Sequence, residues 1–239
     1  MQVELADGVT TVRIDRPPVN AFDLGLLDDA AATVRGLQGP IVLTGAGTCF
    51  SAGVDLRAIV EGGADYTDGF LAAISAAFLA VFDHPAPVVA AINGHAIAGG
   101  CVLAMAADIR LMSSGLIGLS EVAVGVPFPA AALEICRYVM GTSVTRAVLE
   151  ADNIDVQSAA QRGWIDEVVA PDDLMARAVA TARALGQHSP SAYAAMKEQL
   201  HRSAREAIDA GAELNANVQA LWRSEETRAR ISVFLDALK

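Results

Sequence analysis

The spacing of apolar positions changes repeatedly along the chain between a period of two and a helical period. Val3–Leu5 and Val9–Asp15 are predicted strands on either side of Ala6-Asp7-Gly8, whose glycine can adopt a positive φ, so the chain is expected to open with a hairpin. Asp23 is expected to cap a helix with one apolar face. That face comprises Leu24, Leu27, Ala31, Val34 and Leu37.

Short apolar strands and helices then alternate as far as about residue 185. The predicted elements are strands at Ile41–Thr44, Val88–Ile92, Ile109–Met112 and Trp164–Val169, and helices at Gly69–Phe82, Gly100–Ala107, Ala130–Met140, Ser143–Glu150, Gln157–Arg162 and Pro171–Leu185. This alternation indicates an α/β fold.

The last fifty residues have a different pattern. Gln187–Pro190 is interpreted as a joint between an α/β core, residues 1–188, and a helical segment, residues 189–239. Helices are predicted over about Ser191–Ser203 and Glu206–Arg223, and from Glu225 onward. Their apolar positions are more than one core would cover, which favours contact with another subunit. They are Ala195, Leu200, Ile208, Leu214, Val218, Leu221, Ile231, Phe234 and Leu235.

Composition narrows the classes of function. Of the 239 residues, 53% are hydrophobic and 19% are charged, enough for one sizeable domain and apolar enough to favour an oligomer. The net charge of −11 argues against nucleic-acid binding. The first residues, MQVELADG, resemble neither a signal nor a transit peptide.

Neither a membrane span nor a metal site is predicted. The longest apolar candidate, Pro87–Ala107, is broken by Asn93, Gly94, His95 and the pair Gly99-Gly100. The three cysteines, Cys49, Cys101 and Cys136, lack the spacing of metal ligands. Buried, reduced thiols in a cytoplasmic protein are the simplest interpretation.

Two loops have the same design of a short apolar strand, then small residues, then a helix. They span residues 41–56 (IVLTGAGTCFSAGVDL) and 88–103 (VVAAINGHAIAGGCVL). Small residues let a ligand approach the backbone, and a helix start offers unpaired N–H groups. Two such groups converging on one point would form an oxyanion hole. Tight turns and close packing would explain the glycines of either loop equally well.

Together the loops resemble the crotonase (enoyl-CoA hydratase/isomerase) family. The resemblance rests on RPPVNAF at 16–22, FSAGVDL at 50–56, PVVAAINGHAIAGGC at 87–101, ADIR at 107–110, GLSEVAVG at 118–125, AAQRGWIDEVV at 159–169 and SEE at 224–226. It implies an α/β spiral of ββα units with a C-terminal helical trimerisation segment, assembled as a homotrimer or a dimer of trimers. It also implies an acyl-CoA thioester as substrate and no further cofactor.

The resemblance assigns roles to residues of both loops. It places the two oxyanion N–H groups on Val54 and Gly99. It places the acyl-CoA along the first loop, and the implied substrate-binding residues are Ala52, Gly53, Val54, Asp55, Leu56, Gly99 and Ser120. The Asp55 carboxylate is expected to cap the following helix rather than to act in catalysis. His95 is expected to be a hydrogen-bonded turn residue, and Cys101 a packing residue.

The carboxylates distinguish the reactions of the family. Hydratases of the family carry two glutamates, and the position of one of them is Val102 here. The other position is Glu121, among apolar neighbours whose burial would raise its pKa toward that of a general base. Isomerases of the family use one glutamate to move a proton from C2 to C4 of a 3-enoyl thioester. Glu121 with an apolar residue at 102 resembles that branch.

Departures from the family pattern leave alternatives open. Pro127-Phe-Pro129 replaces a glycine-rich stretch, so a different acyl pocket is expected. Glu134 could supply a second carboxylate, although a solvated helix face is the simpler interpretation. Phe234 and Lys239 are weak candidates for CoA contacts. A Δ3,Δ2-enoyl-CoA isomerase is favoured over an enoyl-CoA hydratase or another crotonase activity, and over a non-catalytic acyl-CoA-binding protein.

Overall fold

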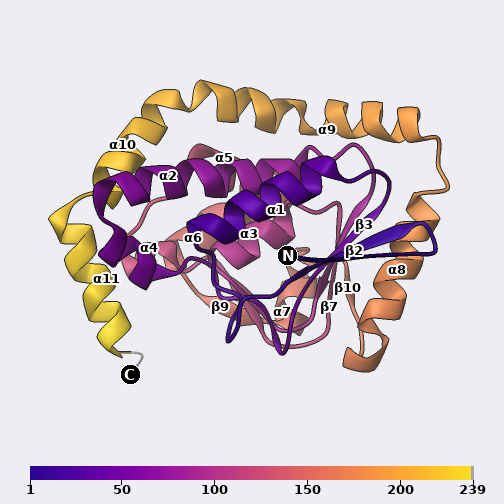
Figure 1. The fold of residues 1–239 in the computed structure, drawn as a ribbon, viewed down its shortest axis with the longest axis horizontal. Coiled ribbons are helices and arrows are strands. Elements are labelled where there is room, and N and C mark those ends of the chain that lie inside the picture. Colours follow the sequence, from indigo (N-terminus) through magenta and orange to yellow (C-terminus); the bar gives the residue numbers. More distant parts are fainter. Residues whose placement is uncertain (238–239) are drawn as a thin grey trace.

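The computed structural model describes residues 1–237, which form two β-sheets surrounded by helices (Figure 1). The larger sheet has the order β1-β2-β3-β5-β7-β10, in which β1 alone runs antiparallel to its neighbour. Its strands are β1 (Gln2–Ala6), β2 (Val9–Ile14), β3 (Ile41–Gly45), β5 (Val88–Ile92), β7 (Ile109–Met112) and β10 (Glu167–Val168). The smaller sheet contains β4 (Cys49–Ser51), β6 (His95–Ile97), β8 (Leu116–Gly118) and β9 (Asn153–Asp155).

The helices follow the strands in a repeating order. They are α1 (Leu24–Gly36), α2 (Leu56–Phe82), α3 (Gly99–Met105), α4 (Glu121–Val124), α5 (Ala130–Met140), α6 (Val144–Glu150), α7 (Val156–Gln161), α8 (Leu174–Leu185), α9 (Pro190–Ala210), α10 (Ala212–Trp222) and α11 (Glu225–Ala237), with 3₁₀ turns at Gly141–Ser143 and Pro171–Asp173. Three times, a strand of the larger sheet leads to a strand of the smaller sheet and then to a helix: β3-β4-α2, β5-β6-α3 and β7-β8-α4. This confirms the predicted α/β class and its ββα units.

The local signals at the N-terminus act as expected. Asp7 and Gly8 both have positive φ in the turn between β1 and β2, which pair antiparallel. The Asp23 carboxylate accepts a hydrogen bond from the Leu26 N–H at 2.8 Å and so caps α1. Leu27, Ala31 and Val34 of the predicted face are buried against α2 and the sheet.

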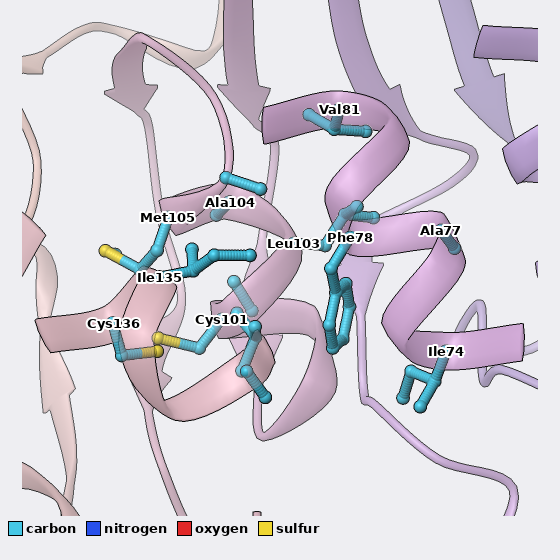
Figure 2. Close-up of a cluster of buried hydrophobic side chains, with 14 of the residues drawn as sticks. Ile74, Ala77, Phe78, Val81, Cys101, Leu103, Ala104, Met105, Ile135 and Cys136 are labelled. Atoms are coloured by element: carbon cyan, nitrogen blue, oxygen red, sulfur yellow. The ribbon is translucent and has the colours of Figure 1, made fainter. Parts of the chain in front are cut away.

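The core lies mainly between the larger sheet and the helices α1, α2, α3 and α5. Figure 2 shows its centre, where Phe78 of α2 approaches Leu103 of α3, and where Cys101 of α3 lies beside Cys136 of α5. A second cluster covers the other face of the sheet, where Val42, Val89 and Leu111 meet Leu174 and Ala178 of α8. Both faces of the central strands are therefore buried, as expected for parallel strands that are apolar at every position.

Helix α2 is longer than the sequence predicted. It begins at Leu56 rather than at Gly69, with a break at Gly63, where φ is 74°. Its length and apolar composition alone would be sufficient for a helix that crosses a membrane. More than half of its apolar window is buried in the fold, however, against α1 and α5. Core packing accounts for that composition.

Three other predictions of the elements were wrong in detail. The strand predicted at Trp164–Val169 is reduced to Glu167–Val168, which pair with β7, while Trp164 and Ile165 are buried in the core outside that pairing. The break predicted near residue 204 lies at Gly211, and α9 is continuous to Ala210. The smaller sheet was not predicted at all, since each of its strands has three residues, too few to show a period.

A buried charge network attaches α9 to the core. The Lys197 ammonium lies 2.8 Å from the Asp108 carboxylate, and only 7% and 14% of the two side chains are exposed. The same carboxylate accepts hydrogen bonds from the Tyr193 hydroxyl at 3.2 Å and from the Val88 N–H at 2.8 Å. Burial lowers the pKa of Lys197, while Asp108 opposes that change. Because all four groups have partners, α9 is fixed against β5 and the turn before β7.

The C-terminal helices fold back over the same chain (Figure 1, orange to yellow). Ile208, Val218 and Ile231 of the predicted apolar faces are buried, and Phe234 packs partly against the core, whereas Leu200, Leu214 and Leu221 remain exposed. Lys239 lies outside the described residues. The division at residue 188 and the trimer both stay predictions.

Candidate active site

The two glycine-rich loops lie against each other, joined by the parallel pairing of β4 with β6. Several of their glycines are required by this contact. A Cβ at Gly94 would lie 1.9 Å from the Thr48 carbonyl oxygen, and one at Gly100 would lie 2.3 Å from that of Ser51. Close packing therefore explains part of the glycine pattern. This agrees with the alternative explanation given for the glycines from the sequence, which was tight turns and close packing.

The N–H groups of Val54 and Gly99 are both available to a ligand. On each side of Val54 the backbone bonds to Phe22, through the Gly53 carbonyl at 2.7 Å and the Asp55 N–H at 2.9 Å. Amides alternate in direction along an extended segment, so the Val54 N–H points away from Phe22. Gly99 is the first residue of α3, where N–H groups have no partner within the helix. Within residues 1–237 neither N–H donates a hydrogen bond.

The residue before Gly99 has a strained backbone. Ala98 has φ 53° and ψ −123°, a conformation unusual for a residue with a Cβ, which costs about 1–3 kcal/mol. Its N–H donates to the Gly118 carbonyl at 2.8 Å, and its carbonyl accepts from the Val102 N–H at 3.1 Å. These bonds hold the peptide that carries the Gly99 N–H, which is consistent with a functional need for its direction.

Glu121 begins α4, immediately after the strand β8 of the smaller sheet. Only 8% of the residue is exposed, and one carboxylate oxygen, Oε2, is buried without a hydrogen-bond partner within the described chain. Burial raises the pKa of Glu121 to about 8, opposed only in part by a backbone hydrogen bond. A buried, unsatisfied carboxyl group costs stability, and such groups gather at functional sites.

Glu121, Val54 and Gly99 line one apolar cavity. Its volume is about 20 Å³, which is room for about one water molecule. Val102, fully buried, lines it as well. The remaining lining residues are Phe70, Leu71, Ile74, Phe78, Pro127, Phe128, Pro129, Ala132 and Trp222. The structure thus brings together the three predicted catalytic positions at one apolar cavity.

The other predicted binding residues lie outside this cavity. The Asp55 carboxylate accepts hydrogen bonds from the N–H groups of Arg57 and Ala58 at 3.1 and 3.2 Å, so it caps α2 as expected. Asp55 also borders an open surface hollow that includes Arg16 and Tyr66. The predicted substrate-binding residues that do not line the cavity are Ala52, Gly53, Asp55, Leu56 and Ser120.

Three further candidates have structural partners. The His95 side chain is exposed at the start of β6 and accepts the Leu116 N–H at 3.1 Å. Cys101 is fully buried, which raises the pKa of its thiol and suits a packing residue. Glu134 pairs with Arg137 at 3.0 Å and is not among the residues that line the cavity.

Sequence reasoning missed the wall that the C-terminal segment supplies. Trp222, at the end of α10, is 3% exposed, and its indole N–H donates to the Pro127 carbonyl at 2.8 Å. Its ring lies 6.4 Å from that of Phe70 in α2. Arg223 then pairs with Asp68, with Nε 2.6 Å from Oδ1. The sequence offered one indication, a tryptophan within a predicted helix. The residues around it do not show which cavity its side chain will border.

The arrangement can stabilise and form an enolate. Two N–H groups that border the same cavity and donate to no other described group can hold a carbonyl oxygen that becomes negative, and each is worth about 3 kcal/mol of barrier. A carboxylate with a raised pKa beside them can remove a proton from the adjacent carbon. Within residues 1–237 no three His, Cys, Asp or Glu side chains lie close enough together to hold a metal ion.

Comparison with known proteins gives a match over nearly the whole chain. Residues 4–239 match the family model described as enoyl-CoA hydratase/isomerase. A protein of Rhizobium meliloti named as a probable enoyl-CoA hydratase is 29% identical over 246 residues, which are 98% of this chain and 93% of that protein.

Solved structures agree in fold. An Mtb enoyl-CoA isomerase is 30% identical, with a TM-score of 0.78 over 90% of this chain and 97% of that one. The human mitochondrial Δ3-Δ2-enoyl-CoA isomerase has a TM-score of 0.92 over 99% of this chain and 97% of that one. At 22% identity the human structure shows the fold alone. The names of these relatives divide between hydratase and isomerase.

Proposed function

This chain belongs to the enoyl-CoA hydratase/isomerase family, and we propose that within it the protein is a Δ3,Δ2-enoyl-CoA isomerase with Glu121 as its base. The observation that carries the proposal is the lining of the cavity. Glu121 lines the same cavity as Val54 and Gly99, whose N–H groups are free, and Val102, which is fully buried, lines it too. By the sequence resemblance, position 102 is where hydratases of the family have a second glutamate.

Each step follows from these groups. The N–H groups of Val54 and Gly99 hold the thioester oxygen, which lowers the energy of the enolate. The Glu121 carboxylate removes a proton from C2 of a 3-enoyl thioester, the electrons move into a dienolate, and the protonated carboxyl returns the proton to C4. The product is the 2-enoyl thioester. Among the described residues that line the cavity, Glu121 is the one with a carboxylate, so the wall offers no second acid to orient the water that hydration would add.

The function is tested by supplying both substrates. Purified protein is incubated with 3-enoyl-CoA and, separately, with 2-enoyl-CoA, and both double-bond migration and hydration are followed. We expect migration with the first and slow or absent hydration with the second. Efficient hydration of 2-enoyl-CoA would instead support the hydratase that the name of the Rhizobium meliloti relative suggests. Binding without either reaction would support a non-catalytic acyl-CoA-binding protein.

The raised pKa of Glu121 predicts the pH dependence of isomerisation. The base must be deprotonated, and with a pKa of about 8 about one molecule in ten carries the carboxylate at pH 7. We expect kcat/KM to rise with pH and to level off above about pH 8, as measured from pH 5.5 to 9.5 with a fixed substrate. A rate that is constant between pH 6 and 9 would show that Glu121 ionises at its ordinary pKa.

The protein is proposed to act in the cytoplasm as a homotrimer or a dimer of trimers. The exposed apolar residues of the C-terminal segment, among them Met196 and Leu200 of α9, support an interface there. Cyclic assembly suits a face that meets a different patch on the next subunit.

A further inference from the structure

A second apolar cavity lies inside the core, beside the catalytic one. It is lined by residues of α1, α2, α3 and the strands β2 and β3 together with Met1 and Phe22, and its volume is also about 20 Å³. Its lining is apolar and includes Ile14, Leu27, Val34, Leu43 and Leu103. The mechanism proposed above makes no use of this inner cavity. Dry apolar cavities of proteins accept apolar ligands when they are large enough.

Phe78 is the wall that the two cavities share. It lines both the catalytic cavity and the inner cavity, and it is 1% exposed. Figure 2 shows its ring extending from α2 toward α3, near Leu103, with Ile74 one turn earlier on α2. Because there is free space on both sides of the ring, Phe78 has fewer neighbouring atoms than a fully packed core ring.

The other aromatic walls of the catalytic cavity are held more firmly. Trp222 is bonded to the Pro127 carbonyl, and Phe70 lies between the rings of Tyr66 and Trp222. Within residues 1–237 no aromatic ring contact involves Phe78. Of the buried aromatic walls, Phe78 is thus the one that separates the acyl site from further apolar space.

From this geometry we propose that Phe78 determines acyl-chain specificity, by closing the catalytic cavity so that only thioesters of short acyl chains fit. The proposal rests on the acyl-CoA site proposed above. The cavity beside Glu121, Val54 and Gly99 has a volume of about 20 Å³, so it widens when the carbons from C1 to C4 enter it. Carbons beyond them reach the buried ring of Phe78. If the ring is removed, the two cavities and the volume of the ring itself become one apolar channel that a longer chain can fill.

The experiment measures binding of saturated acyl-CoA thioesters, which cannot isomerise, by calorimetry. Butanoyl-, hexanoyl-, octanoyl- and decanoyl-CoA are compared on wild-type protein, Phe78→Ala and Phe82→Ala. Phe82 is the control, since it is equally buried on the same helix but stacks on His201 and lines neither cavity. Phe78→Leu is the milder variant if Phe78→Ala fails to fold.

We expect wild-type affinity to stop rising at about the hexanoyl chain. In Phe78→Ala it should continue to rise, by about fourfold for each further methylene buried. The ratio of decanoyl to butanoyl affinity should then increase at least about tenfold over wild type, with no such increase in Phe82→Ala. Phe78→Leu should shift the ratio less, in the same direction.

Two results would overturn the proposal. One is a chain-length profile in Phe78→Ala that matches that of Phe82→Ala. The other is wild-type affinity that rises steadily to decanoyl-CoA. Binding with the expected profiles but no isomerisation of 3-enoyl-CoA would refute the isomerase and leave the role of Phe78 supported. Failure of the wild-type protein to bind any acyl-CoA would refute both.

Discussion

Replacement of Glu121 by glutamine is expected to lower kcat for isomerisation by at least about 10³-fold, while the affinity for acyl-CoA changes less than about tenfold. Glutamine has nearly the same size as glutamate but cannot accept and return a proton, a contribution of about 10²–10⁴ in rate. Within the described chain, Glu121 is the carboxylate that lines the cavity with Val54 and Gly99. Single-turnover kinetics and calorimetry would separate the two effects.

The same substitution is expected to stabilise the protein at high pH. A raised pKa means that the folded state binds more protons than the unfolded state between pH 4.5 and about 8. The free energy of unfolding of the wild type therefore falls with pH across that window, by up to about 1.4 kcal/mol per unit. Glu121→Gln has no such group to ionise, so its advantage should be largest above pH 8.

The control for both measurements is Glu134→Gln. Glu134 lies on α5 and pairs with Arg137 at the surface of the helix. Its replacement should leave turnover and the pH dependence of stability nearly unchanged. If Glu134→Gln abolished turnover, or Glu121→Gln did not, the base would have been assigned to the wrong residue.

Alanine at Gly53 is expected to reduce kcat by about 10²–10³-fold, the loss of one oxyanion donor. Gly53 has φ 83°, and a Cβ there would lie 2.8 Å from the Ile97 carbonyl oxygen and 3.0 Å from the Gly99 nitrogen. The two loops would have to separate, and the Gly99 N–H would move relative to that of Val54. Steady-state kinetics with 3-enoyl-CoA would detect the loss, and thermal unfolding would measure the accompanying strain.

Gly47→Ala separates backbone strain from the effect on the donors. Gly47 lies in the preceding turn with φ 69°, and a Cβ there meets nothing within 4 Å. Both substitutions carry the cost of a positive φ for alanine, but only Gly53→Ala disturbs the contact between the loops. Equal losses of kcat in the two variants would mean that Gly53 serves the turn and not the oxyanion hole.

That Val54, Gly99 and Glu121 would meet at one site could be predicted because each belongs to a continuous motif of the family; their roles as donors and base stay predictions. Val54 follows Ser51-Ala-Gly53, Gly99 follows Ala98, and Glu121 follows Gly118-Leu-Ser120. Small residues alone did not identify the two N–H groups, and the resemblance of both loops to the family assigned them. The raised pKa of Glu121 was also expected from its apolar neighbours, and burial causes it.

The cavity wall could not be predicted in the same way. Phe70, Phe78 and Trp222 have the spacing of ordinary core residues within their own helices. Their role depends on how α2 and α10 cross the site, which is set by packing between distant segments. The short strands of the smaller sheet were missed for a related reason. They are defined by pairing with one another, as β4 pairs with β6 and β6 with β8, and not by a pattern within each strand.

The hydrogen bond from Trp222 to Pro127 has a consequence for the order in which a new chain becomes active. It joins residues 95 positions apart. During synthesis the residues proposed as donors and base leave the ribosome well before the helix that completes their cavity, so we expect a partly made chain to hold them in an open groove. Contacts between distant residues form late because loop closure costs entropy. We therefore expect docking of α10 to be the step at which a nascent chain first excludes water from Glu121.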